Sequence, residues 1–460
     1  MNRHFLLIGA SSFLGLSATI AACSGEPSPS DSILAADASP SSVPTSEGSV
    51  DGGTARDANA SADGATDGKA PPTEAGSDAS VMPTDFGKSL GIDRCVPPGN
   101  PVALAWVRPS RCGAATRQSP IVSTQTGTVV YSKDVSTSSA TLRYGGETIF
   151  GSDGTIYANG ETIVALDGAT RATKWTHFFG ADPVVAVGTP DKVYLAGSYS
   201  ISGFGGGTQL FATDLPHYVR SGVAVLADGS IAYQDGAQTL FVRDGQTGAL
   251  SWSTDLGAPW VAYSQAPVVA TNGTLYLARD TKIVAVSPAT HQILWSIPAK
   301  AKSITLDEQD GRIYFIARDG GYSRVAYVSA DDGSGLTYAT PRFSDNEAGP
   351  LALGDNGWVY FAANVAIHGV QMGTANHWQT PVTSYAEVIV GGDGTVYSTD
   401  VSLTETSVSA HTPSGALRWK KLVATYPSAS QRHRAYLSIA PTGHLAVSVG
   451  ANSTMYLLGP

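Results

Sequence analysis

A turn followed by a tyrosine recurs along this chain about every forty residues, and this period limits the possible architecture more than any other feature. The five clearest copies are Asp153–Tyr157, Asn272–Tyr276, Asp310–Tyr314, Asn356–Tyr360 and Asp393–Tyr397, with weaker copies at Asp191–Tyr194, Asp228–Ile231 and Thr442–Leu445. The intervals from Gly154 to Gly443 cover 289 residues, or about 41 per repeat, which is the length of a four-stranded propeller blade. The short alternating apolar runs between the turns are typical of antiparallel strands. We therefore expect an all-β, eight-bladed propeller over residues 118–460.

A second motif closes many of the repeats. Trp175, Trp252 and Trp295 each follow, by eight residues, Asp167, Asp244 or Ser287, and by five residues a threonine, and the complete form Asp-x-x-Thr-Gly-x-x-x-Trp spans Asp244–Trp252. This spacing resembles the tryptophan-docking motif of the pyrroloquinoline-quinone-type propeller family. The resemblance implies that these indoles, with Trp378, Trp419 and Tyr131 at matching places, pack between neighbouring blades in a structural role. Tyr338 stands in for tryptophan in the fifth repeat, and the second repeat ends at Phe211–Leu215 without one.

The two ends of the repeat region complete each other. The last repeat stops where its fourth strand is due, whereas residues 126–135 align with the tryptophan strand at 247–256 and have no blade before them. Pairing of these ends would close the ring and leave no open seam. A seven-bladed ring is the alternative, if the second or fifth repeat is a long insertion.

The N-terminus is typical of an exported lipoprotein. Arg3 and His4 precede a short apolar run, and residues 1–22 end in Ile20-Ala21-Ala22 before Cys23, which is similar to the lipobox of bacterial lipoproteins. We expect lipid on Cys23, with ordinary secretion as the alternative. Residues 23–85 contain no aromatic residue and form a predicted disordered tether. Its eleven acids against Arg56 and Lys69 supply most of the chain's formal charge of −10, so the propeller itself is nearly neutral and nucleic acid is not an expected partner.

Two cysteines remain in the irregular entry segment, residues 86–117. Cys95 and Cys112 are an even pair in a chain predicted to be exported, which favours one disulfide. Two unpaired thiols are the alternative. Without a supporting histidine cluster, the pair does not indicate a zinc site.

Catalytic signals are weak throughout the repeats. Quinoprotein dehydrogenases of the same fold commonly carry an adjacent-cysteine disulfide under the quinone, and this chain has no Cys-Cys pair. The acids at 307–310 and 331–333 are interpreted as turn residues, with a calcium loop as the alternative. The histidines, His411 among them, lie in different repeats without metal-ligand spacing. We predict no catalytic residue, metal or cofactor.

Aromatic residues outside the repeat pattern are the candidate binding residues. Tyr199 and Phe204 lie in a predicted long loop of the second repeat that ends in the glycine-rich run 203–207, and Trp260 and Tyr263 lie outside the tryptophan register. Loop aromatics are good interface anchors, although they also serve to cover the ends of blades. Basic residues near Arg418 and Lys420 are interpreted as a solvated charge patch.

The combined prediction is an extracytoplasmic lipoprotein, held in the membrane by its N-terminal lipid, with an outer-membrane location favoured. Lipobox and propeller together are similar to the propeller lipoproteins of the outer-membrane β-barrel assembly machinery, which implies a non-enzymatic scaffold with other envelope proteins as partners. The long acidic tether departs from that pattern. A quinone- or metal-dependent enzyme and a sensor for carbohydrates or other small ligands are the alternatives.

Overall fold

A computed structural model describes the chain from Thr116 onward, with short gaps. The described ranges are 116–135, 146–160, 162–179, 184–188, 192–197, 199–219, 221–236, 239–257, 265–279, 281–319, 321–340, 342–343, 349–363, 365–383, 386–426, 434–450 and 454–460. The chain divides into two units, Met1–Ala75 and Gly76–Pro460, and every described residue lies in the second. The predicted signal peptide, lipidated Cys23, tether and Cys95–Cys112 pair therefore lie outside the described residues.

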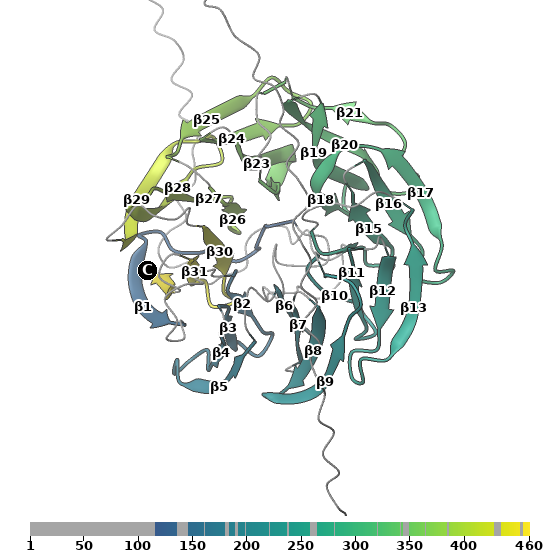
Figure 1. Cartoon of the computed structure of the whole chain (residues 1–460). Helices are drawn as coiled ribbons and strands as arrows, with labels where there is room; N and C mark the ends of the chain where they lie inside the picture. The colour runs from purple at the N-terminus through teal and green to yellow at the C-terminus, as the bar shows by residue number, and fades with distance from the viewer. Residues whose placement is uncertain are drawn as a thin grey trace, which may run out of the picture. The chain divides into compact units, whose positions relative to one another are not determined.

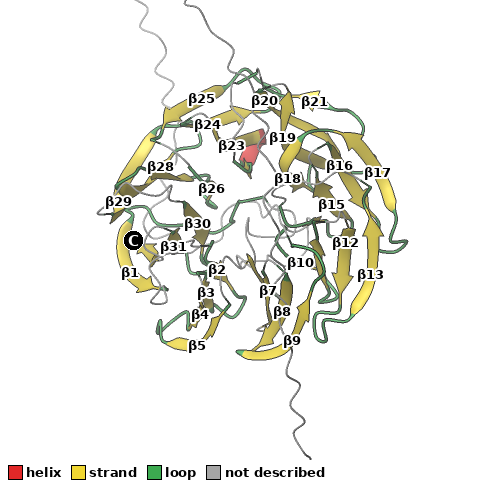
Figure 2. Ribbon diagram, viewed as in Figure 1, coloured by secondary structure: helices red, strands yellow, loops and turns green. Residues whose placement is uncertain are grey.

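The described residues form eight four-stranded antiparallel sheets, which are the blades of a propeller (Figures 1 and 2). Blade 1 contains β2 (Ile149–Phe150), β3 (Ile156–Ala158), β4 (Thr162–Leu166) and β5 (Thr173–Phe178). Blade 2 contains β6 (Val184–Val187), β7 (Lys192–Ala196), β8 (Ser200–Gly205) and β9 (Thr208–Asp214). Blade 3 contains β10 (Ala224–Val225), β11 (Ile231–Gln234), β12 (Thr239–Arg243) and β13 (Leu250–Asp255). Blade 4 contains β14 (Val268–Val269), β15 (Leu275–Ala278), β16 (Lys282–Val286) and β17 (Ile293–Pro298).

The second half of the ring repeats this pattern. Blade 5 contains β18 (Ala301–Asp307), β19 (Arg312–Asp319), β20 (Tyr322–Ser329) and β21 (Thr337–Tyr338). Blade 6 contains β22 (Ala352–Leu353), β23 (Trp358–Ala363), β24 (Ala366–Gln371) and β25 (His377–Pro381), with the 3-10 turn η2 (Asp355–Gly357) between its first two strands. Blade 7 contains β26 (Val388–Val390), β27 (Val396–Val401), β28 (Glu405–His411) and β29 (Leu417–Thr425). Blade 8 contains β30 (Ala435–Ile439), β31 (Leu445–Val449), β32 (Thr454–Gly459) and the amino-terminal β1 (Thr128–Asp134).

The ring closes as the sequence predicts. β1 pairs antiparallel with β32, and a bulge between Val129 and Tyr131 sets Tyr131 opposite Leu457 and Ser132 opposite Tyr456. The second and fifth repeats each form a complete four-stranded sheet, so the eight-bladed prediction is confirmed and the seven-bladed alternative is wrong. No helix among the described residues is long and apolar enough to cross a membrane.

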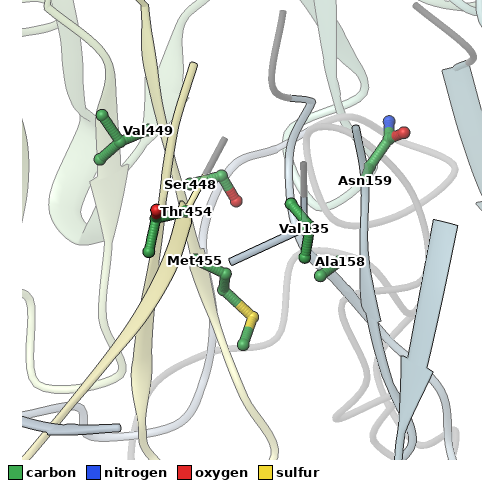
Figure 3. A pocket seen from close by; sticks show the side chains of 7 residues that line it. All are labelled: Val135, Ala158, Asn159, Ser448, Val449, Thr454 and Met455. Carbon is green, nitrogen blue, oxygen red and sulfur yellow. The ribbon is translucent and has the colours of Figure 1, made fainter. Parts of the chain in front are cut away.

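The seam that this closure creates is tightly packed. Figure 3 looks between blades 8 and 1, where Met455 lies opposite Val135 and Ala158 in a space too narrow to admit water. Across the same seam, the Thr148 and Ser448 hydroxyl oxygens are 2.6 Å apart. The two ends of the ring therefore meet in a contact like those inside a continuous core.

The apolar core is divided among the interfaces between blades. Six clusters of buried side chains each join two neighbouring blades, and a seventh joins blades 7, 8 and 1. Central strands such as β4 and β31 are consequently buried on both faces. Outer strands such as β5 alternate between exposed and half-buried residues, because only one of their faces meets a neighbour.

Hydrogen bonds within turns set the spacing between strands. In blade 1, one carboxylate oxygen of Asp153 accepts the Thr155 N–H at 2.9 Å and the other accepts the Thr155 hydroxyl at 2.6 Å, while Gly154 adopts a φ of 81°. Only glycine takes this backbone conformation without strain. In the tryptophan motif, Asp244 accepts the Thr247 N–H at 2.7 Å and its hydroxyl at 2.8 Å, which lowers the pKa of the Asp244 carboxyl.

The recurring tyrosine and tryptophan contact each other and then the next blade. The two rings of one blade lie 5.9 to 6.1 Å apart in four blades, in the pairs Tyr157–Trp175, Tyr276–Trp295, Tyr360–Trp378 and Tyr397–Trp419. In blade 6, the Tyr360 hydroxyl and the Trp378 indole N–H both donate to the Pro413 carbonyl of blade 7, at 3.3 and 2.9 Å. The same two donors of blade 4 converge on the Ala330 carbonyl of blade 5. In these two blades the recurring tyrosine and tryptophan are therefore paired donors that share one acceptor.

In the less regular repeats, other side chains or other contacts replace the usual packing of the tryptophan against the next blade. Phe211 takes the place of a tryptophan in blade 2 and packs on Gly248, and Trp252 stacks on His291 with ring centroids 4.5 Å apart. Tyr338 of blade 5 is half exposed beneath the Arg324 guanidinium, and no side chain lies within 4 Å of the position of a Cβ at Gly373 in blade 6. Blade 5 therefore makes no equivalent ring contact with that glycine.

The different surroundings of Gly415 and Gly373 provide a matched test of the predicted docking role of the tryptophans. An alanine at Gly415 would put its Cβ 2.5 Å from the Trp378 ring, whereas an alanine at Gly373 would meet nothing, and both glycines have positive φ. We expect Gly415→Ala to lower the free energy of unfolding by about 1–3 kcal/mol more than Gly373→Ala, because only the former adds overpacking to backbone strain. Urea unfolding of the two variants measures the difference. Equal losses would mean that the indole contact is dispensable.

Candidate functional site

The centre of the ring receives a segment of the chain's own backbone. Residues 116–124, here called the strap, run parallel to the inner strand of blade 7, with the Val390 N–H donating to the Arg117 carbonyl at 3.0 Å and the Ser119 N–H donating to the Val390 carbonyl at 2.8 Å. Figure 1 shows the strap leaving the centre beside β26 and β30 before it reaches β1. Further bonds join the Thr116 carbonyl to blade 6 and the Ser123 hydroxyl to blade 8.

A buried arginine anchors the strap. Arg117 is 3% exposed, and its Nη1 donates to Oε1 of Glu387 at 2.6 Å, while its Nη2 lies 3.8 Å from Oε2 of Glu147. Glu387 precedes β26 and its Oε2 accepts the Leu437 N–H of blade 8 at 2.7 Å, whereas Glu147 precedes β2 of blade 1. Burial lowers the pKa of the Arg117 guanidinium, and Glu147 offsets part of this effect. One side chain of the strap therefore links blades 7, 8 and 1.

This arrangement does not fit the quinone and calcium of the dehydrogenases that share the fold. Calcium requires several oxygen ligands, but Arg117 already pairs with the Glu147 and Glu387 carboxylates at the centre. The strap also covers the inner edge of β26. In the described part of the chain, no three His, Cys, Asp or Glu side chains are grouped to hold a metal.

The structure places the predicted aromatic binding residues in different environments. Tyr199 is 58% exposed and forms an edge-to-face pair with Tyr218, with ring centroids 5.5 Å apart. Phe204 is 1% exposed on β8 and stacks near Trp175, so its assignment to an exposed loop is wrong. The glycine-rich run predicts a loop because glycine is depleted in strands. In the structure Gly203 lies on β8, where the Phe211 ring leaves no room for a Cβ atom. Trp260 and Tyr263 lie outside the described residues.

Two residues of the predicted basic patch form ion pairs with acids. The Arg418 Nη1 lies 3.0 Å from Oδ2 of Asp393, and the Lys420 Nζ lies 2.7 Å from Oδ2 of Asp400. Arg418 and Lys420 on β29 thus each pair with an acid of their own blade.

A cavity of about 240 Å³ lies between blades 6 and 7. Ile367, Pro381, Val382 and Leu417 supply apolar wall, and Thr380, Ser409, His411 and the Asp400–Lys420 pair supply polar groups. Asp400 Oδ1 also accepts the Thr383 N–H at 2.6 Å, and these bonds keep the pKa of its carboxyl below the ordinary value despite burial. The cavity therefore contains a compensated ion pair and carries no net charge from its acid and base.

His411 is the unusual member of this cavity. It is 1% exposed, and neither ring nitrogen has a hydrogen bond of normal geometry among the described residues. Its ring stacks on Trp378, with centroids 6.0 Å apart. Burial lowers the pKa of His411, and the Gly415 backbone acts weakly in the opposite direction. The imidazole is therefore neutral at pH 7.

A pH dependence of stability follows from the lowered pKa of His411. In the unfolded chain the imidazole protonates near its ordinary pKa of about 6.5, so below that pH the unfolded state binds more protons than the folded state. The free energy of unfolding should then fall as the pH drops from about 6.5 toward the folded pKa. Above a pH of about 6.5, His411 is neutral in both states and should not contribute to the pH dependence. Comparing the pH profiles of wild type and His411→Leu by urea unfolding isolates this term. Parallel profiles for the two proteins would contradict the assignment.

Comparisons with known proteins show that the chain resembles quinone-type propellers. A family model described as outer membrane protein assembly factor BamB matches residues 200–421. Among solved structures, BamB from Moraxella catarrhalis is 14% identical with a TM-score of 0.54, covering 72% of this chain and 99% of its own. The quinohemoprotein alcohol dehydrogenase ADHIIG from Pseudomonas putida HK5 is also 14% identical with a TM-score of 0.54, covering 77% of this chain and 80% of its own.

A europium-containing methanol dehydrogenase is 11% identical with a TM-score of 0.56, covering 77% of this chain and 98% of its own. At such identities, the likeness to solved structures establishes the fold alone. Comparison with curated proteins gave no match. The chain is thus a propeller that resembles BamB and other quinone-type propellers, as the tryptophan motif predicts.

Sequence reasoning missed both the Arg117 cluster and the interblade cavity. Arg117 and Glu387 are 270 residues apart and neither belongs to a motif. His411 had a detectable signal, because aligning the repeats on their tyrosines places it at a position that is apolar in most blades.

Proposed function

We propose that this chain is a non-enzymatic, lipid-anchored propeller of the bacterial cell envelope that binds other envelope proteins. The observation that carries the non-enzymatic part is the strap, since its backbone and the Arg117 ion pairs occupy the inner edge where related dehydrogenases would need free ligands. The match to an outer membrane assembly factor supports a role in protein interaction. Exposed aromatics such as Tyr199 supply contact area of the kind that interfaces use.

The anchor and location rest on the N-terminal sequence. Ile20-Ala21-Ala22-Cys23 fits a lipoprotein processing site, and an acidic tether follows it. A flexible chain of about 60 residues has an r.m.s. span on the order of 45 Å, enough to hold a propeller clear of a membrane surface. We therefore place the protein outside the cytoplasm, with the outer membrane favoured.

The partner assignment is tested by crosslinking in intact cells, followed by affinity purification of the tagged protein. We expect defined envelope proteins, integral outer-membrane proteins among them, to be enriched over a Cys23→Ala control that is still exported. Enrichment of glycans without any protein would favour the sensor alternative. Mass spectrometry of the mature N-terminus checks the anchor separately, because diacylglycerol on Cys23 is expected and an unmodified terminus would contradict it.

A further inference from the structure

Every blade presents the same two ends, because its neighbouring strands run antiparallel. The turns between the first and second strands and between the third and fourth strands lie at one end of the ring, here called the turn end. The connections between the second and third strands, and those that lead to the next blade, lie at the opposite end, here called the loop end. The loop end is therefore one continuous face of the propeller.

Large apolar side chains project from the loop end into solvent. Val365 and Leu403 lie between the second and third strands of blades 6 and 7, and are 61% and 56% exposed. Phe178 ends the outer strand of blade 1 and is 64% exposed. The other exposed large apolar side chains of the described residues lie on, or directly before, outer strands at the circumference of the ring. Tyrosines complete the set at the loop end, namely Tyr199 in blade 2, Tyr218 between blades 2 and 3, and Tyr322 in blade 5.

Val365 is an unfavourable residue for its position. Ala363 pairs with Ala366, so residues 364 and 365 form a two-residue hairpin turn, in which Val365 has a φ of 54°. Glycine and asparagine adopt this conformation readily, whereas a β-branched residue is strained in it. The valine also leaves an apolar side chain in water, and a glycine would avoid both disadvantages. We therefore expect a surface outside the described chain to bury this side chain.

The apolar residues of the loop end are spread around the ring. Blades 1 and 2 lie across the ring from blades 5 and 6 (Figure 1). A standard protein interface buries about 800 Å² on each partner, which suits one side of the ring better than both sides together. A bilayer surface is extended enough to meet both sides at once, and tyrosine rings favour its headgroup level. The spread thus favours a membrane surface over a single protein partner.

Charge distinguishes the two ends of the ring. At the loop end, Lys300 and Arg342 are exposed, and the Arg342 guanidinium lies over the Tyr322 ring at 5.8 Å from its centroid. A stacked guanidinium still presents N–H donors to phosphate. Asp214 and Glu405 are exposed at the same end, so apolar contact carries most of the affinity and the cations add a preference for anionic lipid. The turn end is unsuited to an anionic surface because of its exposed acids, which include Asp153, Asp228, Asp244, Asp310, Asp331 and Asp332.

We propose that the loop end of the propeller binds the headgroup region of an anionic phospholipid bilayer. Val365 and Leu403 enter this region on one side of the ring, and Phe178 and Tyr199 enter it on the other, while the neighbouring cations contact lipid phosphate. The contact needs neither a partner protein nor lipid on Cys23, so it goes beyond the proposed scaffold role. It also brings Tyr199 beside integral outer-membrane proteins, which are among the proposed partners.

The test uses the full mature chain with Cys23→Ala, which cannot carry the lipid anchor. Sedimentation with unilamellar vesicles of phosphatidylethanolamine and phosphatidylglycerol should show saturable binding, and vesicles of phosphatidylcholine alone should bind several-fold more weakly. Added salt should reduce that difference, because it screens the attraction between the cations and the anionic lipid. Absence of binding to both kinds of vesicle, or equal affinity for the two, would overturn the proposal and leave the scaffold role to its own crosslinking test.

Two double variants test the two sides of the ring separately. Val365→Gly with Leu403→Ser, and Phe178→Ser with Tyr199→Ser, should each weaken vesicle binding by about tenfold, because binding scales with the apolar area that enters the interface. Val365→Gly alone should not lower the melting temperature, since glycine relieves the strained turn. A loss of binding in only one of the two double variants would overturn the contact with a flat surface.

The matched control removes equally exposed apolar side chains from the circumference. Leu250 and Leu417 are 52% and 58% exposed at the starts of outer strands, and Leu250→Ser with Leu417→Ser should bind vesicles as the wild type does. An equal loss in this control would mean that general hydrophobicity, and not the loop end, governs binding. Loss of one crosslinked protein from the Val365→Gly and Leu403→Ser variant, in a chain that binds no vesicle, would assign the loop end to a protein partner and refute the bilayer contact.

Discussion

Replacing Arg117 with methionine should lower the free energy of unfolding by about 3–5 kcal/mol. Methionine keeps much of the apolar volume of arginine but leaves Glu147 and Glu387 buried without their cation, and unpaired buried charge is the costly outcome. The effect is large because the strap links blades 7, 8 and 1 through this single side chain. Urea unfolding of wild type and variant at pH 7 measures it.

The control for this prediction is an exposed ion pair. Lys174 and Asp153 are 3.3 Å apart with side chains about 40% exposed, and Lys174→Met should change stability by no more than about 0.5 kcal/mol. The double variant Arg117→Met with Glu387→Gln should lose less than the sum of the two single changes, because the residues act together. Additive losses, or an Arg117→Met variant as stable as Lys174→Met, would contradict the role assigned to the strap.

A disulfide between β1 and β32 should stabilise the ring strongly. Asp134 and Thr454 are register partners across the closure, and cysteines at both positions would enclose about 320 residues of chain, which gives an upper limit of about 6 kcal/mol in the chain-entropy model. The oxidised double variant should therefore melt well above its reduced form. Non-reducing gels identify the crosslink, and calorimetry measures the shift.

Each single-cysteine variant is the control for pairing with a native cysteine. Their melting temperatures should not depend on the redox state beyond the response of the wild type. Failure of the double variant to crosslink in the folded protein would mean that the two strands are not neighbours in solution. The blade order at the closure would then need revision.

Repetition is what made most of the fold predictable. The tyrosine and tryptophan rings contact each other within four blades, and in blades 4 and 6 both donate to one carbonyl in the next blade, so these contacts leave a recurrent spacing in the sequence. The closure was predictable for a related reason, since a fourth strand without a blade and a blade without a fourth strand appear at the two ends. Local sequence thus encodes contacts between neighbours in the ring.

Features made by single residues were not predictable in this way. Arg117 pairs with Glu387 across six complete blades of the chain, and nothing near either residue in the sequence marks the pair. The glycines around Phe204 predict a loop. In the structure Phe204 lies on a strand, and the Trp175 and Phe211 rings pack in the space that those glycines leave. His411 was treated as an ordinary strand residue because its burial depends on the contact of blade 7 with blade 6.

The proposal that the centre of this propeller, which its own strap enters, serves no quinone chemistry has a direct test. Purified protein is titrated with pyrroloquinoline quinone in the presence of calcium, and dye-linked alcohol oxidation is then assayed. The account predicts neither saturable uptake nor turnover, because Arg117 holds the Glu147 and Glu387 carboxylates at the centre. Stoichiometric quinone binding accompanied by turnover would contradict it.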